Sequence, residues 1–192
     1  MTLAAKASAA EWLATARAAA HQPPAQARQR LWVAGQAVGS VATGILSQID
    51  LWRLSDKRYQ LLNQEHSGEW MWHLDVAPDA VTPALNLLAQ ALRAQGQCGP
   101  WRDEQLAVCN AHGERLGTIE RGAVRVLGIA TRAVHLVGLA PDGRIWVQQR
   151  SKTKPNNPGM WDTLMGGMVS AADTLQQVLE RETWEEAGLR LP

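Results

Sequence analysis

Three glutamates near the carboxyl end of the chain have the residue type and spacing that chemistry on phosphates requires. Glu185 and Glu186 follow Glu182 by three and four positions, so a helix would place all three on one face. Carboxylates packed together repel one another, and burying an unpaired carboxylate is costly. A hard divalent cation relieves the repulsion, and magnesium is usually held by a few carboxylates together with water and substrate phosphates. The glutamates therefore indicate a metal site that handles phosphates.

The helix that must carry these glutamates extends an apolar stripe into acidic residues. Leu175, Val178 and Leu179 have the spacing of an inward-facing stripe. The same spacing continues to Glu182 and Glu186. Two carboxylates are thus expected where apolar side chains normally point.

Capping signals mark both ends of this helix. Thr174 and Gln177 have the spacing of a capping box, whereas Ser170 and Asp173 form a rival start signal. Gly188 ends the helix in either case. A glycine pair, Gly166–Gly167, precedes the helix and is expected to form a turn in which backbone and phosphates approach closely.

Taken alone, these charges could equally belong to a solvated helix face, with Arg181 and Glu185 as an ordinary i, i+4 pair. The complete series of spaced residues is Gly167-x5-Asp173-x7-Arg181-Glu182-Thr183-x-Glu185-Glu186-x-Gly188-Leu189, and this series resembles the Nudix box. The resemblance favours a functional site, because a match to a long pattern is far more specific than a lone glycine loop.

The resemblance implies a role for each matching residue. Glu182, Glu185 and Glu186 would ligate magnesium, with manganese as the alternative ion, and the Gly167 backbone carbonyl would assist. Arg181 would orient the glutamates. The reaction would be attack of a metal-activated water on the diphosphate bond of a small organic substrate, releasing a monophosphate.

Two positions depart from the family pattern. Asp173 stands in place of a glutamate, which keeps the charge but shortens its reach towards Arg181 or a metal-bound water. Thr183 replaces an apolar residue, which should affect packing more than chemistry.

The loop before the box supplies candidates for holding the substrate. Arg150, Lys152 and Lys154 follow an expected strand and could bind non-bridging phosphate oxygens. Lysines in a polar loop are more often simply solvated, so this interpretation competes with an ordinary surface role.

The pattern of elements predicts an α+β protein with a small N-terminal α+β domain over residues 1–118. For residues 119–192, the resemblance implies an α/β/α Nudix sandwich with a mixed sheet, incomplete at its C-terminus. Helices are expected at 8–20, 81–94 and 174–187, paired strands within 31–39, and a hairpin at 134–150. The N-terminal part resembles the region that precedes thiamine pyrophosphokinase in some fungi. That likeness points to thiamine diphosphate analogues or nucleoside diphosphates as substrates.

Composition excludes several classes of function. The net charge of +1 argues against a nucleic-acid binder, and no apolar run is long enough to span a membrane. Two cysteines are too few for a disulfide framework, so a cytoplasmic location is expected. A homodimer is compatible with the sequence.

The chain ends at Pro192, shortly after the box, whereas the family fold continues through further strands and a second helix. The catalytic domain is therefore expected to be incomplete, with an apolar sheet face exposed. A Nudix-derived segment that binds a ligand or protein without hydrolysing anything is the alternative function.

Overall fold

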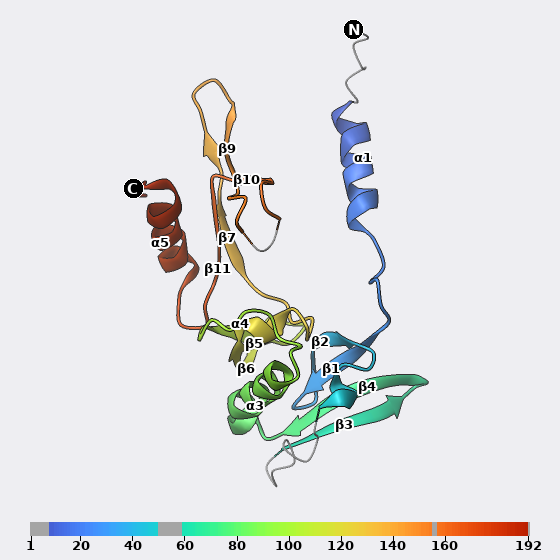
Figure 1. Cartoon of the computed structure of the whole chain (residues 1–192). Helices are drawn as coiled ribbons and strands as arrows, with labels where there is room; N and C mark the ends of the chain where they lie inside the picture. Colours follow the sequence, from blue (N-terminus) through green and yellow to red (C-terminus); the bar gives the residue numbers. More distant parts are fainter. Residues whose placement is uncertain (1–7, 50–58, 155–156, 192) are drawn as a thin grey trace.

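The computed structural model describes residues 8–49, 59–154 and 157–191. Its helices and strands confirm the expected α+β class (Figure 1). In chain order the elements are α1 (Ala9–Ala20), β1 (Arg28–Val33), β2 (Gln36–Ala42), β3 (Tyr59–His66), β4 (Glu69–Val76), α3 (Val81–Ala94), β5 (Gln105–Cys109), β6 (Arg115–Glu120), α4 (Arg121–Val124), β7 (Ala133–Leu136), β8 (Gly138–Leu139), β9 (Ile145–Gln149), β10 (Trp161–Thr163), β11 (Met165–Met168) and α5 (Leu175–Ala187), with 3-10 turns at Leu46–Gln48 and Pro78–Ala80.

The N-terminal body is built on a four-stranded mixed sheet. Its strand order is β2-β1-β4-β3, with β1 parallel to β4 and the two hairpins antiparallel. The helix α3 has the expected range, because its apolar residues recur every three or four positions. Leu85, Leu88 and Leu92 from this face are fully buried in the core.

The N-terminal body extends past the expected domain boundary. The strand β6 runs from Arg115 to Glu120, so a division between residues 118 and 119 would cut a strand that pairs with β5. The apolar core continues through Leu127 and Ile129, and the Leu127 carbonyl accepts a hydrogen bond from Ser40 N–H at 2.9 Å. Burial therefore moves the boundary to about residue 130.

The C-terminal part, residues 130–191, is assembled from short antiparallel strands and α5. The expected hairpin changes partner midway, since β7 pairs with β11 whereas β8 pairs with β9 and β9 pairs with β10. The helix α5 lies against β11 and β7. Among the described strands, the parallel pair that makes a sheet mixed lies in the N-terminal body.

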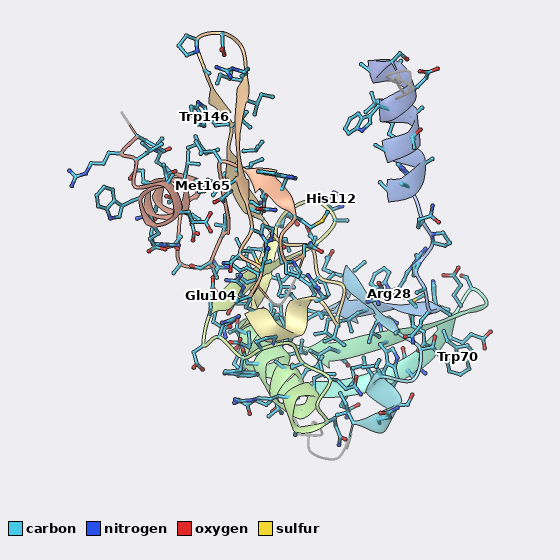
Figure 2. The ribbon with its side chains drawn as sticks, turned by 45° about the horizontal axis from the view of Figure 1, so that its top comes forward. Arg28, Trp70, Glu104, His112, Trp146 and Met165 are labelled. Carbon is cyan, nitrogen blue, oxygen red and sulfur yellow. The ribbon has the colours of Figure 1, made fainter. Side chains whose placement is uncertain are left out.

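Large apolar side chains are exposed on the strands of the C-terminal part. Leu139 and Ile145 face each other across β8 and β9 and are 71% and 61% exposed. Trp146 on the same hairpin is also exposed and projects away from the N-terminal body (Figure 2). The β8–β9 hairpin thus presents an apolar surface.

The helix α1 stands apart from both parts of the molecule (Figure 1). Its amino end is formed by a capping box between Ser8 and Glu11, and none of its residues is buried. Across the described ranges, no helix has the length and apolar character needed to cross a membrane.

Candidate functional site

Of the two rival start signals, the helix α5 uses the capping box of Thr174 and Gln177. Thr174 is its N-cap, and its side chain accepts a hydrogen bond from Gln177 N–H while Gln177 reciprocates. Ser170 and Asp173 instead form a turn before the helix. Gly188 ends α5 in the left-handed conformation, at a φ of 64°. The cap places the acidic residues in the last two turns of the helix.

Asp173 and Arg181 form an ion pair that links this turn to α5. Arg181 Nη2 lies 2.9 Å from an Asp173 carboxylate oxygen and 3.9 Å from a Glu182 oxygen. The hydrogen bond from Arg181 lowers the pKa of Asp173. The same hydrogen bond raises the pKa of Arg181. The shorter aspartate side chain therefore still reaches the arginine.

Glu182 lies directly against the backbone of Gly167. A Cβ atom on Gly167 would come within 2.5 Å of the Glu182 Cγ and Cδ atoms, so this position must be glycine for the carboxylate to lie here. Burial raises the pKa of Glu182, and the negative charges of Glu185 and Glu186 raise it further. The arrangement holds a carboxylate in an environment that disfavours its charged form.

Glu186, one turn further along α5, contacts the neighbouring glycine of β11. Its Oε2 accepts hydrogen bonds from Gln148 Nε2 at 3.2 Å and from Gly166 N–H at 3.4 Å. The expected glycine turn is wrong, because Gly166 and Gly167 belong to β11 and pair with His135 and Val134 of β7. The close approach of side chain and backbone that a turn was expected to allow is provided instead by the strand β11, where Glu182 contacts Gly167.

The inward face of α5 differs from the expected stripe. Leu175 is 51% exposed, whereas Val178 and Thr183 are fully buried. The Thr183 hydroxyl is satisfied inside the helix by donating to the Leu179 carbonyl at 2.5 Å. Thr183 thus takes the packing role of the apolar residue that it replaces.

Glu185 is exposed, unlike Glu182. Its charge nevertheless affects the pKa values of both Arg181 and Glu182. Within the described ranges, no three acidic, histidine or cysteine side chains converge closely enough to form a ready metal site. The glutamates share a helix face, but only Glu182 and Glu186 are held against β11.

The chemistry of these donors still fits a hard divalent cation. Glu182 and Glu186 offer only carboxylate oxygens and contact Gly167 and Gly166, neighbours on β11. Burial raises the pKa of Glu182, and the negative charges of Glu185 and Glu186 add to that rise. Gly167 leaves this approach open because it has no Cβ. A cation between these carboxylates would relieve the repulsion.

The three basic candidates follow β9, with Arg150 directly after the strand and the two lysines in the loop towards β10. Arg150 Nη1 contacts Asp162 Oδ2 at 2.9 Å, and this hydrogen bond lowers the pKa of Asp162. Lys152 and Lys154 are exposed in the loop that follows. The contacts that the structure provides tie Arg150 to a carboxylate of its own hairpin, so its guanidinium charge is already balanced.

A pocket of about 410 Å³ adjoins Glu186. Trp146, Leu164 and Leu189 form apolar walls, and Gln148 lies beside the carboxylate. Sequence reasoning missed Gln148, because a glutamine within a strand carries no spacing signal. Gln148 reaches Glu186 only through the tertiary fold, in which β9 pairs with β10 while α5 packs on β11 and β7.

The C-terminal part of the chain is similar to known proteins. Residues 130–192 match the family model described as the NUDIX domain. An uncharacterized Nudix hydrolase of Pseudomonas aeruginosa is 33% identical over 90 residues, which are 47% of this chain and 49% of the relative. Nudix hydrolase 3 of Arabidopsis thaliana is 36% identical over 92 residues, 47% of this chain and 12% of that protein.

An uncharacterized protein of Saccharomyces cerevisiae is 33% identical over 94 residues, 46% of this chain and 27% of that protein. The chain spans about half the length of the bacterial relatives that it matches, and less of the eukaryotic ones.

Proposed function

Because residues 130–192 match the family model described as the NUDIX domain, we propose that this protein hydrolyses a diphosphate bond in a small organic diphosphate. The observation that carries the proposal is the contact of two α5 carboxylates with neighbouring residues of β11, Glu182 with Gly167 and Glu186 with Gly166. The cation would be magnesium, with manganese as the alternative. Glu182, Glu185 and Glu186 would hold it, with help from the Gly167 carbonyl.

A bound divalent cation would supply charge neutralisation for the phosphates and a lower pKa for a coordinated water. The protein would supply the positioning. Arg181 holds Asp173 at 2.9 Å and lies 3.9 Å from Glu182, so it restrains the first carboxylate of the set. Gln148 restrains Glu186 in the same way from β9.

We infer that the organic portion of the substrate occupies the pocket beside Glu186. The indole of Trp146 and the side chains of Leu164 and Leu189 offer apolar surface to a ring. Nucleoside diphosphate derivatives and thiamine diphosphate analogues both carry such a ring. The products would be a monophosphate ester and a second phosphate species.

Lys152 and Lys154 are the candidates for binding the non-bridging phosphate oxygens. Their side chains are exposed, whereas the Arg150 guanidinium is paired with Asp162. We expect Arg150 to act by shaping the β9–β10 hairpin, and the two lysines to contact phosphate directly.

Two observations favour a second function, in which the chain binds a ligand or a protein without hydrolysis. Glu185 is exposed, and no set of three metal-binding side chains converges among the described residues. A site that binds a cation weakly would retain diphosphate ligands without turning them over.

Release of phosphate product distinguishes the two functions. The chain would be assayed with magnesium over thiamine diphosphate analogues, nucleoside diphosphates, dinucleotides and nucleotide sugars. Glu182→Gln and Glu186→Gln should abolish metal-dependent turnover, whereas Asp142→Asn, in the β8–β9 turn, should not. Turnover that survives either glutamine substitution would refute the proposed site, and binding without turnover would support the second function.

A further inference from the structure

A second pocket, of about 350 Å³, lies at the junction of the N-terminal body and the C-terminal part. Three segments form its walls: the end of β5 with the following turn, residues 130–132, and the loop 169–173. The turn is marked by His112 in Figure 2 and lies on the side of the N-terminal body that faces the C-terminal strands. The described residues that line this pocket include Asp173 but none of the three glutamates of α5.

Backbone hydrogen bonds hold the walls of this junction pocket together. Ala171 N–H donates to the Gln105 carbonyl at 2.7 Å, and Val169 N–H donates to the Arg132 carbonyl at 2.9 Å. Arg115 Nη1 donates to the Ala171 carbonyl at 2.9 Å. The two parts of the chain are thus joined around the pocket, which is a built feature of the fold.

The turn on one wall is also ordered from within. Asn110 is only 8% exposed, and its Oδ1 accepts hydrogen bonds from the His112 and Glu114 N–H groups at 2.9 and 3.0 Å. This pattern is an Asx turn that fixes the backbone from residue 110 to residue 114. The wall therefore needs little reordering when a ligand enters.

The chemistry of the lining is apolar at the base and cationic at the edge. Leu106 and Val169 are buried and supply apolar surface. Arg115 and Arg132 are exposed and bring two guanidinium groups. The carboxylate of Asp173, which also lines the pocket, is balanced by Arg181 at 2.9 Å. The remaining charge is positive, which favours an anion.

We propose that the junction pocket binds a small organic anion. An apolar or aromatic body would pack on Leu106 and Val169, while a single phosphate or carboxylate group would bind Arg115 and Arg132. The volume falls within the range of ordinary small-molecule sites, which often lie where two parts of a chain meet. This site does not depend on hydrolysis at α5, although its ligand would lie next to the Asp173–Arg181 pair.

Cys109 provides a local reporter, because it is half-buried and lines the pocket. The test uses the full chain carrying Cys98→Ser, so that Cys109 is the only thiol, in a buffer with EDTA to remove divalent cations. The rate at which a thiol reagent modifies Cys109 is measured with phenyl phosphate, with benzoate, and with phenol as the neutral control.

We expect phenyl phosphate, benzoate or both to slow modification of Cys109 by about threefold when the ligand concentration is twice its dissociation constant. At that concentration the unbound fraction of the protein, 1/(1 + [L]/Kd), is about one third. Protection by one anion only would identify which group the arginines prefer. Arg132→Gln and Arg115→Gln should each abolish protection. Arg30→Gln, on the surface of β1, should leave it unchanged.

Arg115 also supports the loop 169–173, so loss of protection is read first from Arg132→Gln, with circular dichroism confirming that the variant is folded. No protection by either anion, equal protection by phenol, or unchanged protection in Arg132→Gln would overturn the proposal. Since the test contains no divalent cation and measures no turnover, its outcome is separate from that of the proposed hydrolysis.

Discussion

At the scale of single residues, the three glutamates and Arg181 could be predicted from the sequence because all four lie on one helix, where spacing determines which residues share a face. Gln148 and the strand conformation of Gly166–Gly167 were not, because both depend on which strands pair. The exposure of Leu175 and the burial of Thr183 also follow from how α5 lies on β11, which helical periodicity alone does not specify.

Gly167→Ala tests the close approach of strand and carboxylate. The added methyl would overlap Glu182 Cγ and Cδ, so this flexible side chain must move away from β11, and we expect metal-dependent turnover to fall at least about tenfold. The free energy of unfolding should change by less than about 1 kcal/mol, because a flexible side chain can move at little cost. Phosphate release and denaturant unfolding measure the two effects. Gly99→Ala is the matched control, because the nearest atom to its new methyl lies at 3.4 Å. Unchanged turnover in a folded Gly167→Ala variant would contradict the observed packing.

Asp173→Asn tests the ion pair through its pH dependence. The pKa of Asp173 is lowered in the folded chain, so the ionised side chain stabilises the fold at pH values above the unfolded pKa, near 3.8. That contribution is lost as the pH falls through the lowered folded value. The stability difference between parent and variant should therefore be present at neutral pH and shrink in acid. Asp173→Glu should keep it, and a difference independent of pH would count against the pair.

At the scale of elements, α1, α3 and α5 were predictable because capping boxes and apolar periodicity are local signals. The β3–β4 hairpin was overlooked, although Ser67–Gly68 provides its turn and both residues have positive φ. The expected hairpin at 134–150 is divided, because β7 pairs with β11 whereas β8 pairs with β9. The sequence does not predict this division, since nothing between β7 and β8 indicates a change of partner strand.

The start of α5 can be tested at its cap. Thr174→Ala removes the side-chain acceptor for Gln177 N–H and should cost about 1 kcal/mol in stability. Thr174→Ser should restore it, because serine caps equally well. Thermal unfolding followed by circular dichroism measures both variants. If alanine has no effect, the helix does not begin at this residue.

At the scale of the whole molecule, the C-terminal part exposes apolar side chains on its β8–β9 hairpin. Leu139 and Ile145 are cross-strand neighbours and largely exposed. Such adjacent exposed side chains favour association with other apolar surfaces.

We expect the folded chain to bind an apolar fluorescent dye such as ANS, and Leu139→Ser with Ile145→Ser to reduce that fluorescence substantially. Leu13→Ser, on the isolated helix α1, is the control and should change it little, because that side chain has few apolar neighbours. Undiminished dye binding in the double variant would show that the dye binds an apolar surface other than Leu139 and Ile145.

The central claim is that the carboxylates held against β11 bind a divalent cation. Its most direct test is Mn²⁺ binding followed by electron paramagnetic resonance, in the full chain and in Glu182→Gln and Glu186→Gln. We expect one Mn²⁺ site in the parent, whose affinity falls at least about tenfold in either variant because a charged ligand is removed. No bound Mn²⁺ in the parent, or unchanged binding in both variants, would contradict it.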